Sequence, residues 1–322
     1  MTNGDGVSEI KLNLFKDYDE VEFLKRVKFE NIEAIVLYKD FDDSEISYKD
    51  ADFQKLLTKY RLFKSDLRLL NLIENKSKIK SIQILLDLES EETLKILYQF
   101  ENLENLSIGN SVCPFTFKLD VTAWKNLKKL TTNGNIEIIG LDKIDLKTLI
   151  VNENKRFKIG SCGNALRSLQ FIASKPFNLN EFFDSADLRS LTLTQTSIRS
   201  LEGIGHYEYL ANLQINYCSK LTDISALEKC QSLQIVEFES CKNIQDLTPL
   251  TALKNLKQLV LFKCGEIPSL GFINEIPSLE SILFTETNIL DGDLRPCLRL
   301  KSAWSSTGKR HYNINVEDLP HN

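Results

Sequence analysis

A frame of apolar residues returns every 23 positions in this sequence. Each turn of the frame has apolar residues spaced as in L-x-x-L-x-L, then a cysteine three positions on and a further apolar residue three beyond it. A unit this short cannot bury its own apolar face, so successive units must stack and share a core. The frame therefore predicts a solenoid. Its clearest turns are Leu210, Leu213, Ile215, Cys218, Leu221; Leu233, Val236, Phe238, Cys241, Ile244; and Leu256, Leu259, Leu261, Cys264, Ile267.

The same frame can be followed through nearly the whole chain. Near the N-terminus, Ile35 and Leu37 match Leu12 and Leu14 at a separation of 23. A chain of 322 residues would usually form about two domains, but a solenoid grows along one axis, and we predict a single domain over 1–322. Its parts are N-terminal repeats at 9–78, regular repeats at 79–299 and a C-terminal cap at 300–322. Further turns start at Ile79, Leu103, Leu127, Leu146, Leu166, Leu188, Leu279 and Leu300, at intervals of 19 to 24.

The segments that return the chain between strands change along the sequence. Apolar residues between 51 and 74 alternate steps of three and four, which predicts a long helical insertion on the convex side, as one helix or two short ones, with Asp50 as its N-cap. Ser90, followed by two glutamates, predicts helical returns in the N-terminal half. In the C-terminal half the returns are shorter and contain Pro249, which favours 3-10 turns.

These repeats resemble a known family. The frame has the spacing of leucine-rich repeats, and the segments 221–227 and 244–256 are similar to the short-repeat class of bacterial internalins and of a leucine-rich regulator of a protein phosphatase. The resemblance implies an α/β horseshoe with a parallel sheet on its concave face, and a protein-binding role without catalytic residues. The run from Lys309 to Tyr312 resembles a last-repeat motif of bacterial intracellular leucine-rich proteins.

Composition indicates the compartment and the partner classes. The chain has no apolar run of signal-peptide or membrane-spanning length, and its odd number of cysteines, 7, lacks the paired cap motifs of extracellular repeats. We therefore expect a cytoplasmic protein. The net charge of -5 argues against nucleic-acid and anionic-membrane binding, and we expect protein partners and a monomer.

Three cysteines recur in the frame and could indicate a metal site, but their spacing does not favour one. Cys218, Cys241 and Cys264 fall on successive coils about 5 Å apart, so three thiolates cannot converge on one metal ion. We predict a buried ladder and no metal or cofactor. Cys297 and His311 near the last coil are the one pair that could act as nucleophile and base, or they are simply cap residues. We expect no enzymatic activity.

Residues between the core positions should project from the concave sheet, because side chains alternate across a strand. Along the last coils these positions form an apolar cluster with charged residues beside it, which is typical of a protein-binding surface. A one-residue slip would turn Trp304 inward, since its neighbours Ala303 and Ser305 are small. The predicted binding residues are Asn216, Glu237, Glu239, Val260, Phe262, Lys263, Leu283, Glu286 and Trp304.

Two functions are consistent with these observations. The first is a non-enzymatic interaction module that holds one protein partner on its concave face, for example a bacterial immunity or regulatory protein. Within it, Glu237 and Glu239 either prefer a basic partner or keep the face soluble. The second is a leucine-rich repeat effector or ligase that uses a catalytic cysteine, Cys297, at its C-terminal end.

Overall fold

The computed structural model describes residues 8–13, 32–38, 70, 71, 73, 75–87, 94–110, 116–152, 165–173, 179 and 187–321. The chain divides into two units, residues 1–146 and 147–322. The single continuous domain that the sequence predicts stays a prediction. Among the described residues, no helix has the length and apolar character needed to cross a membrane.

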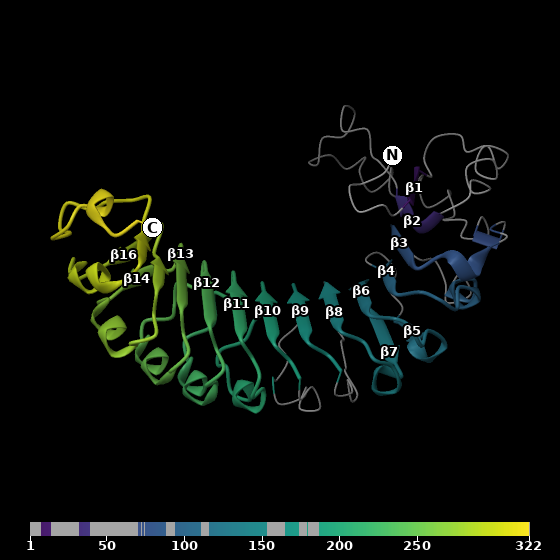
Figure 1. Ribbon diagram of the computed structural model, residues 1–322, viewed down its shortest axis with the longest axis horizontal. Coiled ribbons are helices and arrows are strands. Elements are labelled where there is room, and N and C mark those ends of the chain that lie inside the picture. The colour runs from purple at the N-terminus through teal and green to yellow at the C-terminus, as the bar shows by residue number, and fades with distance from the viewer. Residues whose placement is uncertain are drawn as a thin grey trace, which may run out of the picture. The chain divides into compact units, whose positions relative to one another are not determined.

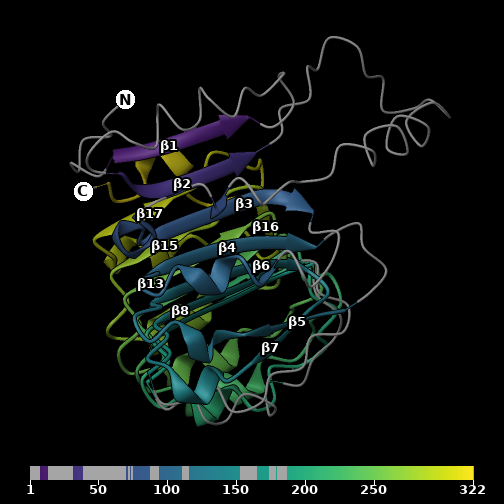
Figure 2. The same cartoon turned by 90° about the vertical axis from the view of Figure 1, so that its right-hand side faces the viewer.

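The first unit is built on parallel strands that pair in chain order, one strand for each turn of the frame (Figure 2). Its main strands are β1 (Ser8–Asn13), β2 (Ile32–Tyr38), β3 (Ser81–Asp87), β4 (Asn105–Asn110) and β6 (Lys129–Gly134). A second, two-stranded parallel sheet joins β5 (Phe117–Asp120) to β7 (Ile136–Ile139).

The first two strands pair in a register that differs from the predicted one. Leu12 lies opposite Leu37 and Ile10 opposite Ile35, so the sequence separation is 25 rather than 23. A shift of two residues leaves the same side chains on the same face of a strand, because the side-chain period is two. The apolar alternation of Ile10 and Leu12 therefore satisfies the frame as well as Leu12 and Leu14 would.

Where the structure describes the returns of the first unit, they contain 3-10 turns, and the prediction of true helices is wrong for the described residues between Leu94 and Leu146. Leu94 itself is helical, but Ser90 lies outside the described residues, as do Asp50 and most of the predicted helix at 51–74. Repeats of 19 to 24 residues leave few positions for a return, and a 3-10 turn rises faster per residue. These turns are η2 (Lys76–Lys78), η3 (Leu97–Gln99), η4 (Val121–Ala123) and η5 (Leu141–Lys143).

The second unit repeats the same design with greater regularity (Figure 1). Residues alternate between buried and partly exposed along most strands, which gives a buried face and an open face to the sheet. Its strands are β8 (Thr148–Asn152), β9 (Ser168–Ile172), β10 (Ser190–Thr194), β11 (Asn212–Asn216), β12 (Ile235–Glu239), β13 (Gln258–Phe262), β15 (Ser281–Leu283) and β17 (Ser302–Trp304). A separate pair joins β14 (Gly265–Ile267) to β16 (Thr287–Ile289).

The returns of the second unit contain the 3-10 turns that the sequence predicts. Asp223 and Asp246 each accept a hydrogen bond from the backbone N–H two residues later, at 2.9 Å, and so start the turns at Ser225–Lys229 and Thr248–Ala252. The turns are η7 (Ile204–His206), η8 (Ser225–Lys229), η9 (Thr248–Ala252), η10 (Gly271–Glu275), η11 (Arg295–Arg299) and η12 (Val316–Asp318).

The cysteine ladder is buried in the core of this unit, as predicted. The thiols of Cys218, Cys241 and Cys264 are free and fully covered. Cys241 Sγ donates to the Ile215 carbonyl of the preceding coil at 3.3 Å, and Cys264 Sγ to the Phe238 carbonyl at 3.1 Å. The three cysteines therefore connect backbone groups of successive coils. Burial raises the pKa of Cys241 to about 12, which keeps this thiol protonated.

Candidate protein-binding surface

The predicted binding residues lie on the open face of the sheet, on consecutive strands of the second unit. Glu237 pairs with Val260, Val260 with Leu283, and Leu283 with Trp304, so one column of outward residues crosses β12, β13, β15 and β17. Ala303 is fully buried while Trp304 is 45% exposed. The strand register thus points Trp304 outward, and the one-residue slip that would have turned it inward does not occur.

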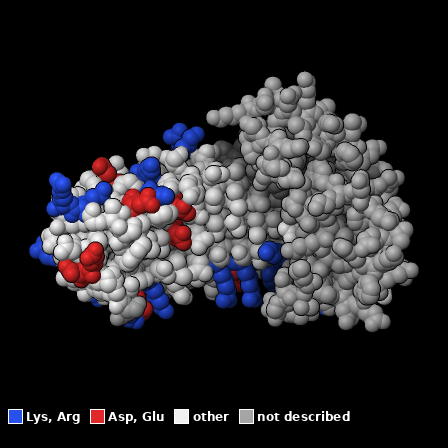
Figure 3. All heavy atoms as spheres, turned by 90° about the horizontal axis from the view of Figure 1, so that it is seen from above, with Lys and Arg blue, Asp and Glu red and all other residues white. Residues whose placement is uncertain are grey.

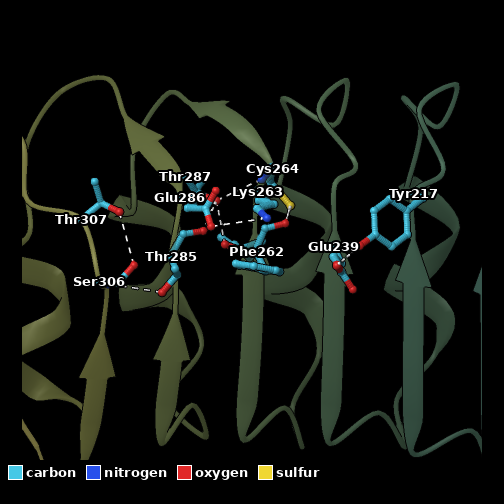
Figure 4. A network of polar contacts seen from close by, with 11 residues as sticks. Tyr217, Glu239, Phe262, Lys263, Cys264, Thr285, Glu286, Thr287, Ser306 and Thr307 are labelled. Carbon is cyan, nitrogen blue, oxygen red and sulfur yellow. Dashed lines mark hydrogen bonds and ion pairs between the residues drawn. The ribbon is translucent and has the colours of Figure 1, made fainter. Parts of the chain in front are cut away.

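A second outward column lies two residues further along the strands. Asn216 pairs with Glu239, and Glu239 with Phe262, as the frame predicts. Asn216 Nδ2 donates to Thr194 Oγ1 on the neighbouring strand at 3.5 Å. Further along, Thr285 is only 7% exposed and lies between Phe262 and Ser306 (Figure 4). Its hydroxyl accepts a hydrogen bond from the Ser306 N–H at 3.3 Å.

The apolar cluster consists of Val260, Phe262, Leu283 and Trp304. The first three side chains are half-buried and Trp304 is exposed. Adjacent strands are about 4.8 Å apart, so these side chains are close enough to form one continuous apolar area. An exposed aromatic ring beside half-buried aliphatic side chains can supply the central anchor of a protein interface.

The acidic pair, Glu237 and Glu239, borders this cluster on β12. Glu237 is half-buried, and its burial together with the nearby charge of Glu239 raises the pKa of the Glu237 carboxyl. Gln214 Nε2 donates to Glu237 Oε2 at 3.3 Å. The Tyr217 hydroxyl donates to Glu239 Oε1 at 2.5 Å, and this bond raises the pKa of the tyrosine (Figure 4).

Lys263 and Glu286 form a charged pair at the other side of Phe262. Lys263 Nζ lies 3.5 Å from Glu286 Oε1 and 4.8 Å from the centre of the Phe262 ring, so the ammonium contacts both an anion and an aromatic face. Both charged side chains are well exposed, and such a pair adds little stability. Seen from above, acidic and basic side chains lie close together on a mainly uncharged surface (Figure 3). The predicted site residues are thus brought onto one face.

Sequence reasoning missed the backbone feature that places Tyr217 and Lys263 at the edge of this face. Both residues have positive φ, although neither is glycine. The Tyr217 N–H donates to the Glu239 carbonyl of the next coil at 2.7 Å, and the Lys263 N–H to the Thr285 carbonyl at 3.0 Å. This hydrogen bond extends the ladder past the strand end and offsets the cost of the left-handed conformation. The same conformation recurs at Ala173, Gln195, Tyr217, Ser240, Lys263 and Glu286.

The pair weighed as nucleophile and base has no catalytic geometry. Cys297 is fully buried, and burial raises the pKa of its thiol to about 12, whereas a nucleophilic cysteine needs an accessible thiol with a lowered pKa. His311 Nε2 is bonded to the Ile289 carbonyl at 2.9 Å, and its ring packs against Tyr312. The Tyr312 hydroxyl in turn donates to the Thr287 carbonyl at 3.3 Å. These residues close the C-terminal end of the unit. Cys113 and Cys162 lie outside the described residues.

Comparison with curated sequences finds distant relatives in plants. No protein-family model matches the chain. The disease resistance protein RPS4B of Arabidopsis thaliana is 29% identical over 125 residues, which cover 38% of this chain. The disease resistance protein RRS1 of the same plant is 26% identical over 207 residues, which cover 63%. The matched parts span 10% and 14% of those two proteins, so the chain corresponds to a small part of each.

Comparison with solved structures shows the fold. An internalin, InlF, from Listeria monocytogenes has a TM-score of 0.50 at 17% sequence identity, covering 80% of this chain and 89% of that one. The functional domain of InlJ from the same bacterium, described as including a cysteine ladder, also has a TM-score of 0.50 at 17% identity and covers 72% of this chain and 56% of that one. The repeating frame, the parallel strands paired in chain order and these structural likenesses show that the chain has the leucine-rich repeat fold.

Proposed function

We propose that this protein is a non-enzymatic interaction module that binds a protein partner on the concave face of its C-terminal coils. The observation that carries the proposal is the apolar cluster on the open face of β13, β15 and β17, where Trp304 is exposed beside three half-buried apolar side chains. Burial of such a cluster against a partner would supply most of the binding free energy, and the charged residues around it would supply selectivity.

A cytoplasmic bacterial regulator or immunity protein is the form of this function that we favour. Its support is the composition, from which we expect a cytoplasmic protein, and the run Lys309–Tyr312, which resembles a last-repeat motif of bacterial intracellular leucine-rich proteins. The plant relatives are named for disease resistance, which is a property of those proteins. An immunity protein would cover the active surface of a toxin, and a face of several adjacent strands offers the area needed for this. No observation favours the ligase alternative, since Cys297 is buried.

The proposal is tested by removing the apolar cluster while keeping the fold. The double variant Val260→Asp and Phe262→Asp places two charges on the open face, where neither side chain is part of the buried core. We expect it to lose a partner that the unaltered protein captures from host lysate and that mass spectrometry identifies. The purified partner should then bind the variant at least a hundredfold more weakly, because two carboxylates would have to lose water against the partner's apolar side chains.

The matched control is Leu298→Asp, which adds a charge at a side chain that is 52% exposed in the return η11. Circular dichroism and the melting temperature should match those of the unaltered protein for both variants. Equal capture by the Val260/Phe262 variant and the unaltered protein would refute the proposed surface.

A further inference from the structure

The acidic pair has no cationic partner among the described residues. Glu237 and Glu239 are two residues apart on β12, so they project from the same face with about 6.6 Å between their Cα atoms. Their hydrogen-bond donors are neutral, the Gln214 amide and the Tyr217 hydroxyl. The nearby ammonium of Lys263 pairs instead with Glu286. Two carboxylates therefore lie together on this face, and no positive charge in the described part of the chain is paired with them.

This arrangement has an electrostatic cost in the free protein. Glu237 is half-buried, and the pKa of its carboxyl is raised by burial and by the like charge of Glu239. A partner cation placed between the two carboxylates would remove the repulsion and replace the water that binding displaces. The repulsion between the two carboxylates in the free protein would thus favour a partner that brings a positive charge over partners that do not.

The acidic pair and the apolar cluster also share a boundary. Glu237 lies directly opposite Val260, and Glu239 directly opposite Phe262. From β12 to β17 the face crosses three strand spacings, or about 14 Å, which an extended chain covers in four to five residues. One short segment can therefore contact the acidic pair at one end and Trp304 at the other.

We infer that the occupant of this surface is a protein segment in which an arginine lies within about five residues of large apolar side chains, with its guanidinium between Glu237 and Glu239. The apolar side chains then lie against Val260, Leu283 and Trp304. The inference rests on the proposed function and specifies the chemistry of its partner.

An arginine fits this site better than a lysine. Its planar guanidinium has five N–H donors and can bond two carboxylates at once, while an ammonium acts as a compact point charge. A guanidinium also stacks on aromatic rings, and Tyr217, a residue that is 48% exposed, lies beside Glu239. An acidic segment or a nucleic-acid phosphate would instead meet two uncompensated carboxylates.

The test is a selection of random twelve-residue peptides displayed on phage, with the full chain immobilised. The enriched peptides are synthesised and their binding to purified protein is measured by fluorescence anisotropy. We expect them to carry an arginine within five positions of Trp, Phe, Leu or Ile. Replacing that arginine by alanine should weaken binding at least tenfold, and replacing it by lysine should weaken binding less.

A double-mutant cycle then assigns the contact. The double variant Glu237→Gln and Glu239→Gln should weaken binding of the arginine peptide about as much as the Arg→Ala change in the peptide does. Combining the protein and peptide changes should weaken binding little further. The control, Glu228→Gln with Glu275→Gln, alters net charge equally in the exposed parts of the returns η8 and η10 and should leave affinity unchanged.

The outcomes separate this inference from the proposed function. Peptides that do not bind the Phe262→Asp variant but bind the Glu237/Glu239 variant with full affinity would overturn the arginine inference. The proposed binding surface would then remain supported. A selection without any peptide that depends on Phe262 would overturn both. Melting temperatures of the variants, measured in parallel, establish that each one is folded.

Discussion

At the scale of single residues, Gly292 occupies a backbone position that no side chain fits. Its φ is +66°, and a Cβ atom there would lie 2.2 Å from the carbonyl oxygen of His311. We expect Gly292→Ala to destabilise the protein by about 2 kcal/mol or more, because the left-handed conformation and the backbone overlap both oppose the methyl group. Urea unfolding followed by circular dichroism measures the loss.

Gly308→Ala is the matched control for this change. A Cβ at Gly308 would meet Val316 Cγ2 at 3.6 Å, an ordinary van der Waals contact, and the residue lies in the same C-terminal cap. We expect its unfolding midpoint to stay close to that of the unaltered protein. Equal midpoints for the two variants would contradict the proposed role of Gly292.

The candidate site shows which residue-scale features a sequence can reveal. The outward positions of Glu237, Val260 and Trp304 follow from the frame, because alternation along a strand needs no knowledge of neighbouring atoms. The positive φ of Tyr217 does not, since left-handed backbone is usually signalled by glycine or asparagine. The burial of Thr285 depends on the side chains of adjacent coils and is likewise invisible in the sequence.

At the scale of elements, the 3-10 turns η8, η9 and η11 of the second unit each begin just after an aspartate that accepts a backbone N–H bond. Asp246 Oδ1 accepts hydrogen bonds from the Thr248 hydroxyl at 2.6 Å and the Thr248 N–H at 2.9 Å, and these bonds lower the pKa of the carboxyl. Asp223 accepts from the Ser225 N–H at 2.9 Å and from the Ser200 hydroxyl at 3.3 Å, and the pKa of its carboxyl is also lowered. The ionised carboxylate is therefore the form that stabilises the start of each turn.

The pH dependence of stability should reveal this contribution. A lowered folded pKa gives stability that is present above the unfolded value, about 3.9, and is lost as the pH falls through the folded pKa. We expect the unaltered protein to lose more unfolding free energy between pH 6 and pH 3 than Asp246→Asn, which keeps an acceptor oxygen but cannot be protonated. Urea unfolding at both pH values gives the difference.

A control at the next return distinguishes the turn from general charge effects. Glu275→Gln removes an exposed carboxylate at the end of η10. It should leave the pH dependence of unfolding close to that of the unaltered protein. If Asp246→Asn and Glu275→Gln gave the same change between pH 6 and pH 3, the hydrogen bonds at Asp246 would not be the cause.

The elements also show why part of the fold could be predicted and part could not. Pro249 and the short returns around it predict 3-10 turns, because proline lacks a backbone donor, and η9 confirms this. The helical signals after Ser90 are local, whereas the length of a return is fixed by the coil spacing, so Leu97–Gln99 form a 3-10 turn instead. The register of β1 and β2 differs from prediction by two residues, a shift that the apolar alternation cannot detect.

At the scale of the whole molecule, stability depends on contacts between coils, since no repeat has a core of its own. In the second unit the cysteine ladder is part of this coupling. Each thiol is covered by the coil before it and donates to a carbonyl 25 or 26 residues earlier: Cys218 to Leu193, Cys241 to Ile215 and Cys264 to Phe238. Opening one coil therefore exposes groups of its neighbours, which favours cooperative loss of the three coils.

Thiol labelling measures this cooperativity directly. We expect the ladder cysteines to resist alkylation in the folded protein, because burial covers the sulfurs and raises the pKa of Cys241 to about 12 and of Cys264 to about 11. With increasing urea, Cys218, Cys241 and Cys264 should become labelled over one common transition, followed residue by residue by peptide mass spectrometry.

Two variants test whether the ladder causes this coupling. Cys241→Ala should move that transition to lower urea for Cys218 and Cys264 together, whereas Cys241→Ser, which keeps a hydroxyl donor, should move it less. Separate transitions for the two remaining cysteines, or equal shifts in the alanine and serine variants, would show that the ladder does not couple the coils.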